Sequence, residues 1–436
     1  MRRFRSILVH ASLIGALMVT LAPGTATQVE VPGIDKPVVV VSGRITSDTT
    51  WEDQFYYVLR GAVFVQDGAR LTIEPGTTIV GETATQGTLV IARGSRIIAN
   101  GRRDAPIVFT SDQPVGERGR GDWGGLIING RAPLNVSGGE GVGEGDTGVY
   151  GGDDPNDNSG ILRYVRVEFA GIEFSPDNEL NGIAFQGVGR GTVVDYVQVK
   201  ANKDDGVEFF GGTADAKHLV LTSIADDSLD WTDGWVGRLQ FVVAHQRGDD
   251  ANNGIEADNS GDNNNLQPRS DPTIYNATFI GDPDNNEGSE SDNGWVLREG
   301  TAATIRNFIV MGFKEWGINI DHTATVEQIR NGNLTLANGI LFQNGLLPGF
   351  AHFDDDAAPF FAGSPTIRIA DPGLIDPYNH ENPNYRPRGA ATLAGGQLAP
   401  ATPPNDGFFE VTTYIGALSP DPAQDWTRGW TNFEQQ

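Results

Sequence analysis

Three acidic residues occupy the same position in a sequence pattern that repeats through the middle of the chain. Glu208, Asp230 and Glu256 each stand two residues after a Gly or Ser and lie between apolar residues. If the repeats are neighbouring parallel strands, the three side chains point out of one face about 4.8 Å apart. Like charges this close bind a cation, share a proton or spread into water. We therefore expect an exposed carboxylate column that binds a ligand or acts as a catalytic site.

More acidic residues lie next to this column and complete a candidate metal site. Asp204, Asp205, Asp226 and Asp227 are in the turns before the strands, and Asp258 is the next outward residue of the third segment. Calcium takes oxygen ligands, and the chain has 57 Asp and Glu residues but no Cys. Calcium is therefore the expected cofactor. The alternative is a solvated acidic surface, because tight turns also require Asp and Asn.

Three further residues are predicted to contact a bound ligand. Lys200 and His245 end the second strand of their coils, in one column with Glu168 and Thr222. These residues predict a positively charged side chain, Lys200, and a base, His245, near one end of the acidic column. Trp235 follows a turn and is expected to offer a face on which a sugar stacks.

The strands that would position these residues belong to an internal repeat. Six segments fit one template, a turn that is usually two Asp or Asn residues, then Gly or Ser, then an apolar–polar alternation. They are NGIAFQ, DGVEFF, DSLDWT, NGIEAD, NGWVLR and WGINID. Their spacing is about 23 residues with one longer interval, which is typical of a solenoid whose insertions become loops.

A second strand of each coil shows the same period of two. DYVQVK, KHLVLT, QFVVAH, YNATFI and RNFIVM superpose with apolar third and fifth positions. Two or three short strands fill the repeat and leave no room for a helix, so the pattern predicts an all-β, single-stranded parallel β-helix. The inward positions of the template should be buried. They include Val207, Phe209, Leu229, Trp231, Ile255, Trp295, Ile318 and Ile320.

The chain divides into three predicted parts. Residues 1–26 combine three Arg, an apolar run and small residues, as in a secretory signal peptide, so no membrane insertion is expected after its removal. Residues 27–345 form the β-helix, and 346–436 are a Pro-rich tail expected to fold over the stack as a capping segment. Loop insertions are expected at about 131–160, 259–272 and 281–292.

Charge restricts the possible partners. The formal net charge is −26, a surface that repels nucleic acid and anionic membranes and excludes DNA or RNA binding as the function. Polyanionic glycans would also be repelled unless a cation mediates the contact. The expected partners are extracellular polysaccharides or other surface molecules.

Other stretches of the chain resemble a known family. The motifs are RLTIEPGTTI, GTLVIARGSRIIANG, APIVFTS, GDWGGLIING, LRYVRVEFAG, GVGRGTVVDYVQV and DDGVEFFGGT, with PNYRPRG, TYIGAL and DWTRGWTNF near the end. Together they resemble a widespread family of secreted bacterial right-handed β-helix proteins, similar in fold to pectin lyases. The resemblance implies fold and export but no catalytic residues. Asp204-Asp205 matches the paired aspartates of polygalacturonases, but their Gly-His-Gly and Arg-x-Lys motifs are missing from the sequence.

Two classes of function are therefore predicted. In the favoured one, the chain is a secreted protein of the periplasm, cell surface or extracellular space, an acidic, calcium-binding module that engages polysaccharide or surface partners. In the alternative, it is a glycoside hydrolase or polysaccharide lyase that uses Glu208, Asp230 and Glu256. The module is favoured because the acidic field opposes uronate substrates.

Overall fold

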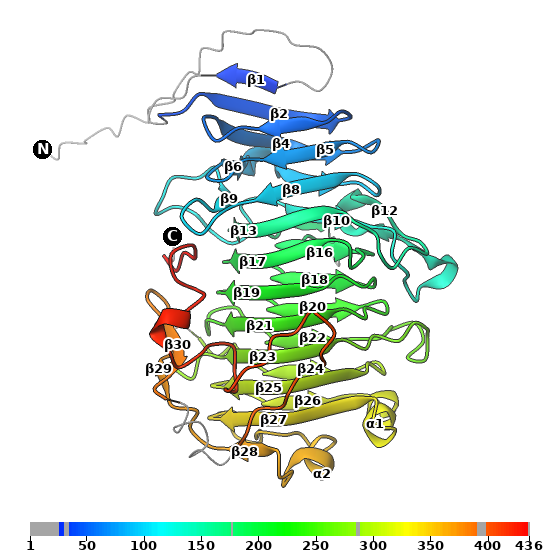
Figure 1. Ribbon diagram of the computed structural model, residues 1–436, viewed down its shortest axis with the longest axis vertical. Helices are drawn as coiled ribbons and strands as arrows, with labels where there is room; N and C mark the ends of the chain where they lie inside the picture. The colour runs from blue at the N-terminus through cyan, green and yellow to red at the C-terminus, as the bar shows by residue number, and fades with distance from the viewer. Residues whose placement is uncertain (1–25, 30–34, 176–177, 285–287, 390–397, 435–436) are drawn as a thin grey trace, which may run out of the picture.

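The computed structural model describes residues 26–29, 35–175, 178–284, 288–389 and 398–434, and these form a long stack of β-coils (Figure 1). The predicted signal peptide lies outside the described residues except for Ala26. Among the described residues no helix has the length and apolar character needed to cross a membrane.

One 24-stranded sheet forms the stack, and its pairings are parallel except that of β1 with β2. This topology confirms the predicted parallel β-helix and fits a right-handed one. The first coils contain β1 (Ala26–Val29), β2 (Val38–Ile45), β3 (Thr49–Trp51), β4 (Tyr56–Val65), β5 (Arg70–Ile73), β6 (Thr78–Gly81), β7 (Thr88–Ile91), β8 (Arg96–Asn100) and β9 (Ile107–Ser111), with the short 3-10 helix η1 (Thr83–Thr85).

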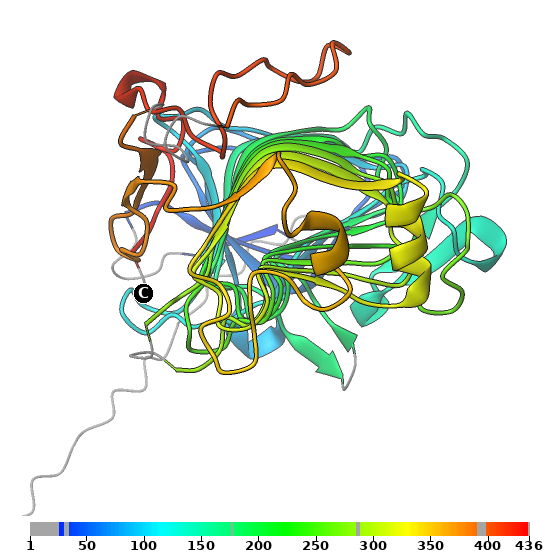
Figure 2. The same cartoon turned by 90° about the horizontal axis from the view of Figure 1, so that it is seen from below.

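The later coils alternate one short and one long strand. The short strands are β10 (Gly125–Asn129), β16 (Ile183–Gln186), β18 (Val207–Phe210), β20 (Leu229–Thr232), β22 (Ile255–Ala257), β24 (Trp295–Leu297) and β26 (Ile318–Ile320). The long strands are β13 (Gly160–Glu168), β17 (Val193–Lys200), β19 (Ala216–Thr222), β21 (Arg238–His245), β23 (Thr273–Ile280), β25 (Ala303–Met311) and β27 (Leu334–Phe342). Seen from the end, the coils superpose around one interior (Figure 2).

The register of the short strands follows the sequence template. Glu208 pairs with Asp230, and Asp230 pairs with Glu256, so the three carboxylates form the predicted column on one parallel sheet. The predicted inward residues of this sheet are all buried in one continuous apolar cluster. Period-two alternation therefore identified both the core and the outward column correctly.

The long strands bend where one residue adopts a left-handed conformation, which the template did not predict. These residues are Tyr164, Tyr196, His218, Phe241, Asn276, Asn307 and Asn338, with φ between 48° and 63°. Asn adopts the left-handed conformation readily, whereas Tyr and Phe are sterically strained in it. The rings of the first four stack in succession, with centroids 4.1 to 4.9 Å apart, and this stacking offsets part of the strain.

Residues 131–160 leave the stack and cover part of the short-strand sheet. They contain η2 (Ser137–Gly139), the hairpin β11 (Glu140–Gly143) and β12 (Gly148–Gly151), and η3 (Glu144–Asp146), and they lie beside the small hairpin β14 (Glu173–Ser175) and β15 (Asn178–Glu179). Leu134 and Tyr150 pack on the outward residues Ile127 and Ala184 in a separate apolar cluster. Residues 259–272 follow β22, and 281–292 precede β24 with 285–287 outside the described residues.

The tail covers two parts of the stack: the open end of its core and the outer face of the long strands. Phe353, Ala357 and Phe361, the last from α2 (Ala358–Phe361), close the end of the core beside β28 (Ile367–Ile369), and α1 (Thr323–Arg330) adds Val326. The flanking hairpin, residues 371–388, contains β29 (Leu374–Asp376) and β30 (Asn384–Pro387). The C-terminal strap, residues 398–434 with η5 (Pro422–Gln424), runs back along the outer face of the long strands (Figure 1).

The strap lies on the flank because the outward residues of the long strands are apolar and would otherwise face water. Phe241, Val243 and Ile309 form a second buried cluster with Ile415 and Trp430 of the strap. The predicted cap therefore covers a sheet face as well as an open end.

Candidate functional site: an acidic cavity

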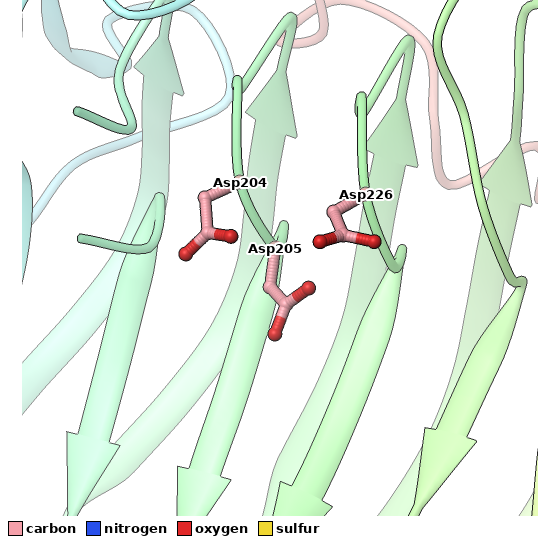
Figure 3. Close-up of side chains that lie close together, drawn as sticks. All are labelled: Asp204, Asp205 and Asp226. Atoms are coloured by element: carbon pink, nitrogen blue, oxygen red, sulfur yellow. The ribbon is translucent and has the colours of Figure 1, made fainter. Parts of the chain in front are cut away.

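An acidic cavity of about 260 Å³ opens on the outer face of the short strands. Its lining residues are Glu144, Glu179, Asp204, Asp205, Glu208, Asp226, Asp227, Asp230, Asn252 and Glu256. Figure 3 shows Asp204, Asp205 and Asp226 approaching one another from the turns of neighbouring coils. The structure thus brings seven of the eight predicted acidic site residues to one cavity.

The turn residues link each coil to the next through the backbone. The N–H of Asp227 donates to Asp205 Oδ1 at 3.1 Å, and the N–H of Asn253 donates to Asp227 Oδ1 at 2.6 Å. The N–H of Trp316 donates to Asn293 Oδ1 in the same way, because Asp or Asn stands at this place in the first five turns of the template. The bonds to Asp205 and Asp227 use one oxygen of each carboxylate, and they fix the direction of its side chain.

Two polar oxygens in and beside the outward column lack partners. Asn181 Nδ2 donates to Glu208 Oε2 at 2.5 Å. Asp230 Oδ1 and Asn181 Oδ1 are shielded from solvent, and neither has a hydrogen-bond partner within the described part of the chain. A buried oxygen without a donor is unfavourable unless a ligand satisfies it.

Two groups of three carboxylates have the spacing of a metal-binding set. Ligand oxygens of Asp205, Glu208 and Asp230 lie within 4.8 Å of one another, and so do those of Asp204, Asp205 and Asp226. Asp205 belongs to both groups. Oxygen atoms at this spacing, mixed with an amide side chain, are ligands that calcium prefers.

Burial and mutual repulsion favour the protonated form of these acids. Burial first, then Asp226 and Glu179, raise the pKa of Asp204 to about 7. Burial, then Asp204 and Glu179, raise the pKa of Glu144 to about 7. Burial and neighbouring acids also raise, well above the ordinary values, the pKa of Asp205, Glu208, Asp227 and Asp230. The acids can ionise together only if a positive charge offsets them.

One arginine forms ion pairs at the Glu256 end of the column. Arg298 bonds Glu256 and donates from Nε to Asp258 Oδ1 at 2.9 Å. Burial raises the pKa of Glu256 to about 7 although Arg298 opposes the shift. Asp258, a predicted metal ligand, is therefore occupied by Arg298 and does not line the cavity.

The expected exposure of the column is wrong for all three members, and most clearly for Glu208. Glu208 is only 8% exposed, and Asp230 and Glu256 are half-buried. The cause is the insertion of residues 131–160, which places Glu144 over the strands. A pattern with a period of two indicates which side of a strand a residue faces, but not what covers that side.

The three predicted ligand contacts lie elsewhere. The column of Lys200 and His245 has the predicted register, but both residues are buried beneath the C-terminal segments: Lys200 Nζ donates to the Glu434 carbonyl, and His245 contacts Tyr385. Trp235 is fully buried, stacked at 4.1 Å on Phe209, so the prediction of an exposed sugar platform is wrong. Burying this indole in the core is favourable because its N–H finds a partner in the Ala214 carbonyl.

Four residues of the site were not identified from the sequence. Glu144 and Glu179 come from insertions, where no repeat fixes their place. Arg298 and Asn252 could have been found. Arg298 occupies the template position of Asp258 one coil later, and Asn252 occupies that of Asp226.

Comparison with known proteins agrees with this architecture. The sequence matches the family described as pectate-lyase like beta helix domain over residues 43–346, more than half of the chain. The chain belongs to this family. The match ends where the long strands end, so the flanking hairpin and the strap lie outside it. No curated protein and no solved structure gave a match. Membership in a pectate-lyase-like family suggests a role related to glycans.

Proposed function

We propose that the protein is a secreted or cell-surface module that binds calcium in the acidic cavity and engages extracellular polysaccharide through it. The observation that carries the proposal is the shielded, unpartnered Asp230 Oδ1 beside the carboxylates of Asp205 and Glu208. A hard divalent cation satisfies these oxygens and offsets their repulsion in one step. A plain solvated surface would instead leave each oxygen in contact with water.

Asp205 is the central ligand in this proposal because it belongs to both three-carboxylate groups. Glu208 and Asp230 would complete one position, and Asp204 and Asp226 the other. Calcium takes six to eight oxygens, including those of waters, so a cation held by three carboxylates has positions left for ligand oxygens. Hydroxyl or carboxylate oxygens of a glycan can take those positions.

The net charge of −26 gives the cation a second role. The uncompensated acidic field repels uronate-containing chains, so we expect their binding to require calcium. Neutral glycans would be less sensitive to the cation. Family membership supports a glycan as the partner.

An alternative is a glycan-cleaving enzyme, because Glu208 and Asp230 bring oxygens within 4.8 Å, close to the separation of about 5 Å in retaining glycosidases. Such enzymes need one ionised and one protonated carboxyl. Here burial and neighbouring acids raise the pKa of both. Arg298 pairs with Glu256 and Asp258 instead, and within the described residues no ion pair reaches Glu208 or Asp230, so the module is favoured over the enzyme.

Calorimetry of the full-length protein with CaCl₂ at pH 7.5 tests the proposal. The wild type should bind calcium, and Asp230→Asn should weaken binding at least tenfold, by about 1.4 kcal/mol. Asp104→Asn is the matched control, because Asp104 is an exposed carboxylate in the first coils. Binding heats that are absent at millimolar calcium, or unchanged by Asp230→Asn, would refute the cation site.

A second measurement separates the module from the enzyme. The protein is incubated with uronate and with neutral polysaccharides, in CaCl₂ or in EGTA. Two quantities are recorded: the amount of protein that the polysaccharide retains, and the number of new chain ends that cleavage releases. The module predicts calcium-dependent retention without cleavage. Cleavage that Glu208→Gln and Asp230→Asn each abolish would establish the enzyme instead.

A further inference from the structure

Two histidines meet face to face where the flanking hairpin contacts the stack. His245 ends β21, and His380 lies between β29 and β30, which sit beside the ends of β21 and β23 (Figure 1). The ring centroids are 4.3 Å apart with an interplanar angle of 15°. This contact joins the β-helix to a segment outside the family match.

The pair differs in its access to solvent and in its partners. His245 is 2% exposed, its Nδ1 lies 3.1 Å from the hydroxyl of Tyr385, and its Nε2 is shielded without a partner in the described structure. His380 is more accessible, and its Nε2 lies 3.8 Å from Asp282 Oδ2. His380 therefore lies next to a carboxylate, whereas Nδ1 of His245 faces a tyrosine hydroxyl.

The other charges around the pair come from three elements. Asp282 follows β23, Arg247 follows β21, and Tyr385 and Tyr378 belong to the flanking hairpin. Burial first, then His380, lower the pKa of His245 well below its ordinary value. Burial raises the pKa of Asp282, but the nearby imidazole of His380 and the hydrogen bonds from the N–H groups of Gly248 and Asp284 outweigh burial, so the pKa of Asp282 is lowered. The ammonium group of Lys314 also interacts electrostatically with the carboxylate of Asp282.

We propose that His245 and His380 form an acid-operated clasp that holds the flanking hairpin on the stack at neutral pH and releases it on acidification. With one proton on the pair, the carboxylate of Asp282 offsets the single positive charge. The two rings can then stack with only one of them charged. A second proton puts two imidazolium rings 4.3 Å apart in a shielded place, beside Arg247 and with one carboxylate. Like charges so placed repel, and both histidines ionise freely once the hairpin moves into water.

Release of the hairpin weakens the hold of the strap as well. Arg386 of β30 donates to the Pro420 carbonyl at 3.1 Å and lies 3.5 Å from Asp425. Tyr385 meets Phe433 edge to face with centroids 6.2 Å apart. Acid therefore controls access to the apolar outer face of the long strands, including Val243 and Ile280.

Hydrogen exchange of the full-length protein, read by mass spectrometry and corrected for intrinsic rates, tests the clasp. Between pH 7.5 and 5.0, protection of residues 371–388 should fall at least tenfold, while β25 and β27 keep theirs. His380→Phe keeps an aromatic ring on His245 without a second charge, so its hairpin should stay protected at pH 5.0. His322→Phe is the control, because His322 is a half-exposed histidine at the start of α1.

Asp282→Asn shifts the response in the opposite direction. It removes the carboxylate that lets the closed pair hold one proton, so the hairpin should be released at a higher pH than in the wild type. A purely structural role for Asp282 would loosen the hairpin equally at all pH values. The clasp is refuted if wild-type protection is the same at both pH values, or if His380→Phe keeps the wild-type loss. It is also refuted if Asp282→Asn leaves the release pH unchanged.

Discussion

Two outer faces of the same solenoid have opposite chemistry. On the short strands, the outward column carries Glu208, Asp230 and Glu256 and forms one side of an open acidic cavity. On the long strands, the outward face is mostly aromatic and aliphatic, with a few amide side chains, and lies under the strap. The face that carries the proposed function is the one that remains partly open. The other behaves as a second core.

Besides its apolar contacts, the strap is held through its backbone by two side-chain amides of the long strands. The side-chain amide of Gln198 both donates to and accepts from the backbone of Asn432, and Gln240 does the same with Glu410. Each amide replaces the hydrogen bonds that a neighbouring strand would make, so the outer face can bind an extended segment without a β-ladder. Outward residues of this solenoid therefore line an open cavity only where no other segment packs directly on them.

The largest effect on stability is expected from a substitution that removes a buried ring between the strap and the long strands. Trp430 is buried in the strap and meets Tyr164 and Tyr196 edge to face. Trp430→Ala should lower the free energy of unfolding by about 3 to 5 kcal/mol, because it removes a large buried ring and leaves a cavity. Urea unfolding measures it. Val411→Ala, at a strap residue 72% exposed, should change stability by less than about 0.5 kcal/mol. Equal effects would contradict the role of the strap as a core layer.

Calcium should stabilise the open face. At about one hundred times its dissociation constant, calcium should raise the free energy of unfolding of the wild type by roughly 2.7 kcal/mol, through binding to the native state. The increase should be larger at low salt, where repulsion between the acids is least screened. At the same calcium concentration, the increase should be much smaller in Asp230→Asn. A melting temperature that neither calcium nor chelator changes would leave the cavity as plain surface.

The two faces should respond to pH with opposite sign. Carboxyl groups such as Glu144 and Asp204, whose pKa is raised to about 7, add stability that is complete below about pH 4 and is lost as pH rises through 7. His245, whose pKa is lowered, adds stability above about pH 6.5 that is lost as pH falls. With chelator present, unfolding free energy should fall by at least about 1 kcal/mol between pH 5 and 7. Asp230→Asn should reduce that fall, and a flat profile would contradict the raised pKa values.

The smallest effect concerns the end of the acidic column. Arg298→Gln removes the positive charge beside Glu256 and Asp258, so calcium should bind about threefold more tightly. Arg60→Gln is the control, because it breaks an ion pair with Glu82 in the first coils. Calorimetry with CaCl₂ measures both variants. Weaker binding in Arg298→Gln would mean that Arg298 positions the ligands rather than opposing the cation.

The coil repeat, the inward residues and the carboxylate column all follow from the sequence. The reason is that strand pairing is local: each coil rests on the preceding one, and the side-chain period of two fixes the face of every residue in it. Glu208, Asp230 and Glu256 can therefore be aligned from the sequence alone, as can the turn residues Asp205 and Asp227.

Only the tertiary structure decided which outward residues stay accessible. Glu144 reaches the cavity from an insertion, and Tyr385 and Glu434 reach His245 and Lys200 from the end of the chain. These segments lie far from their targets in sequence and carry no repeat, so no local pattern encodes where they dock. Their docking is decided by the apolar area they bury, and it separates a buried lysine and histidine from the acidic groups that line the cavity.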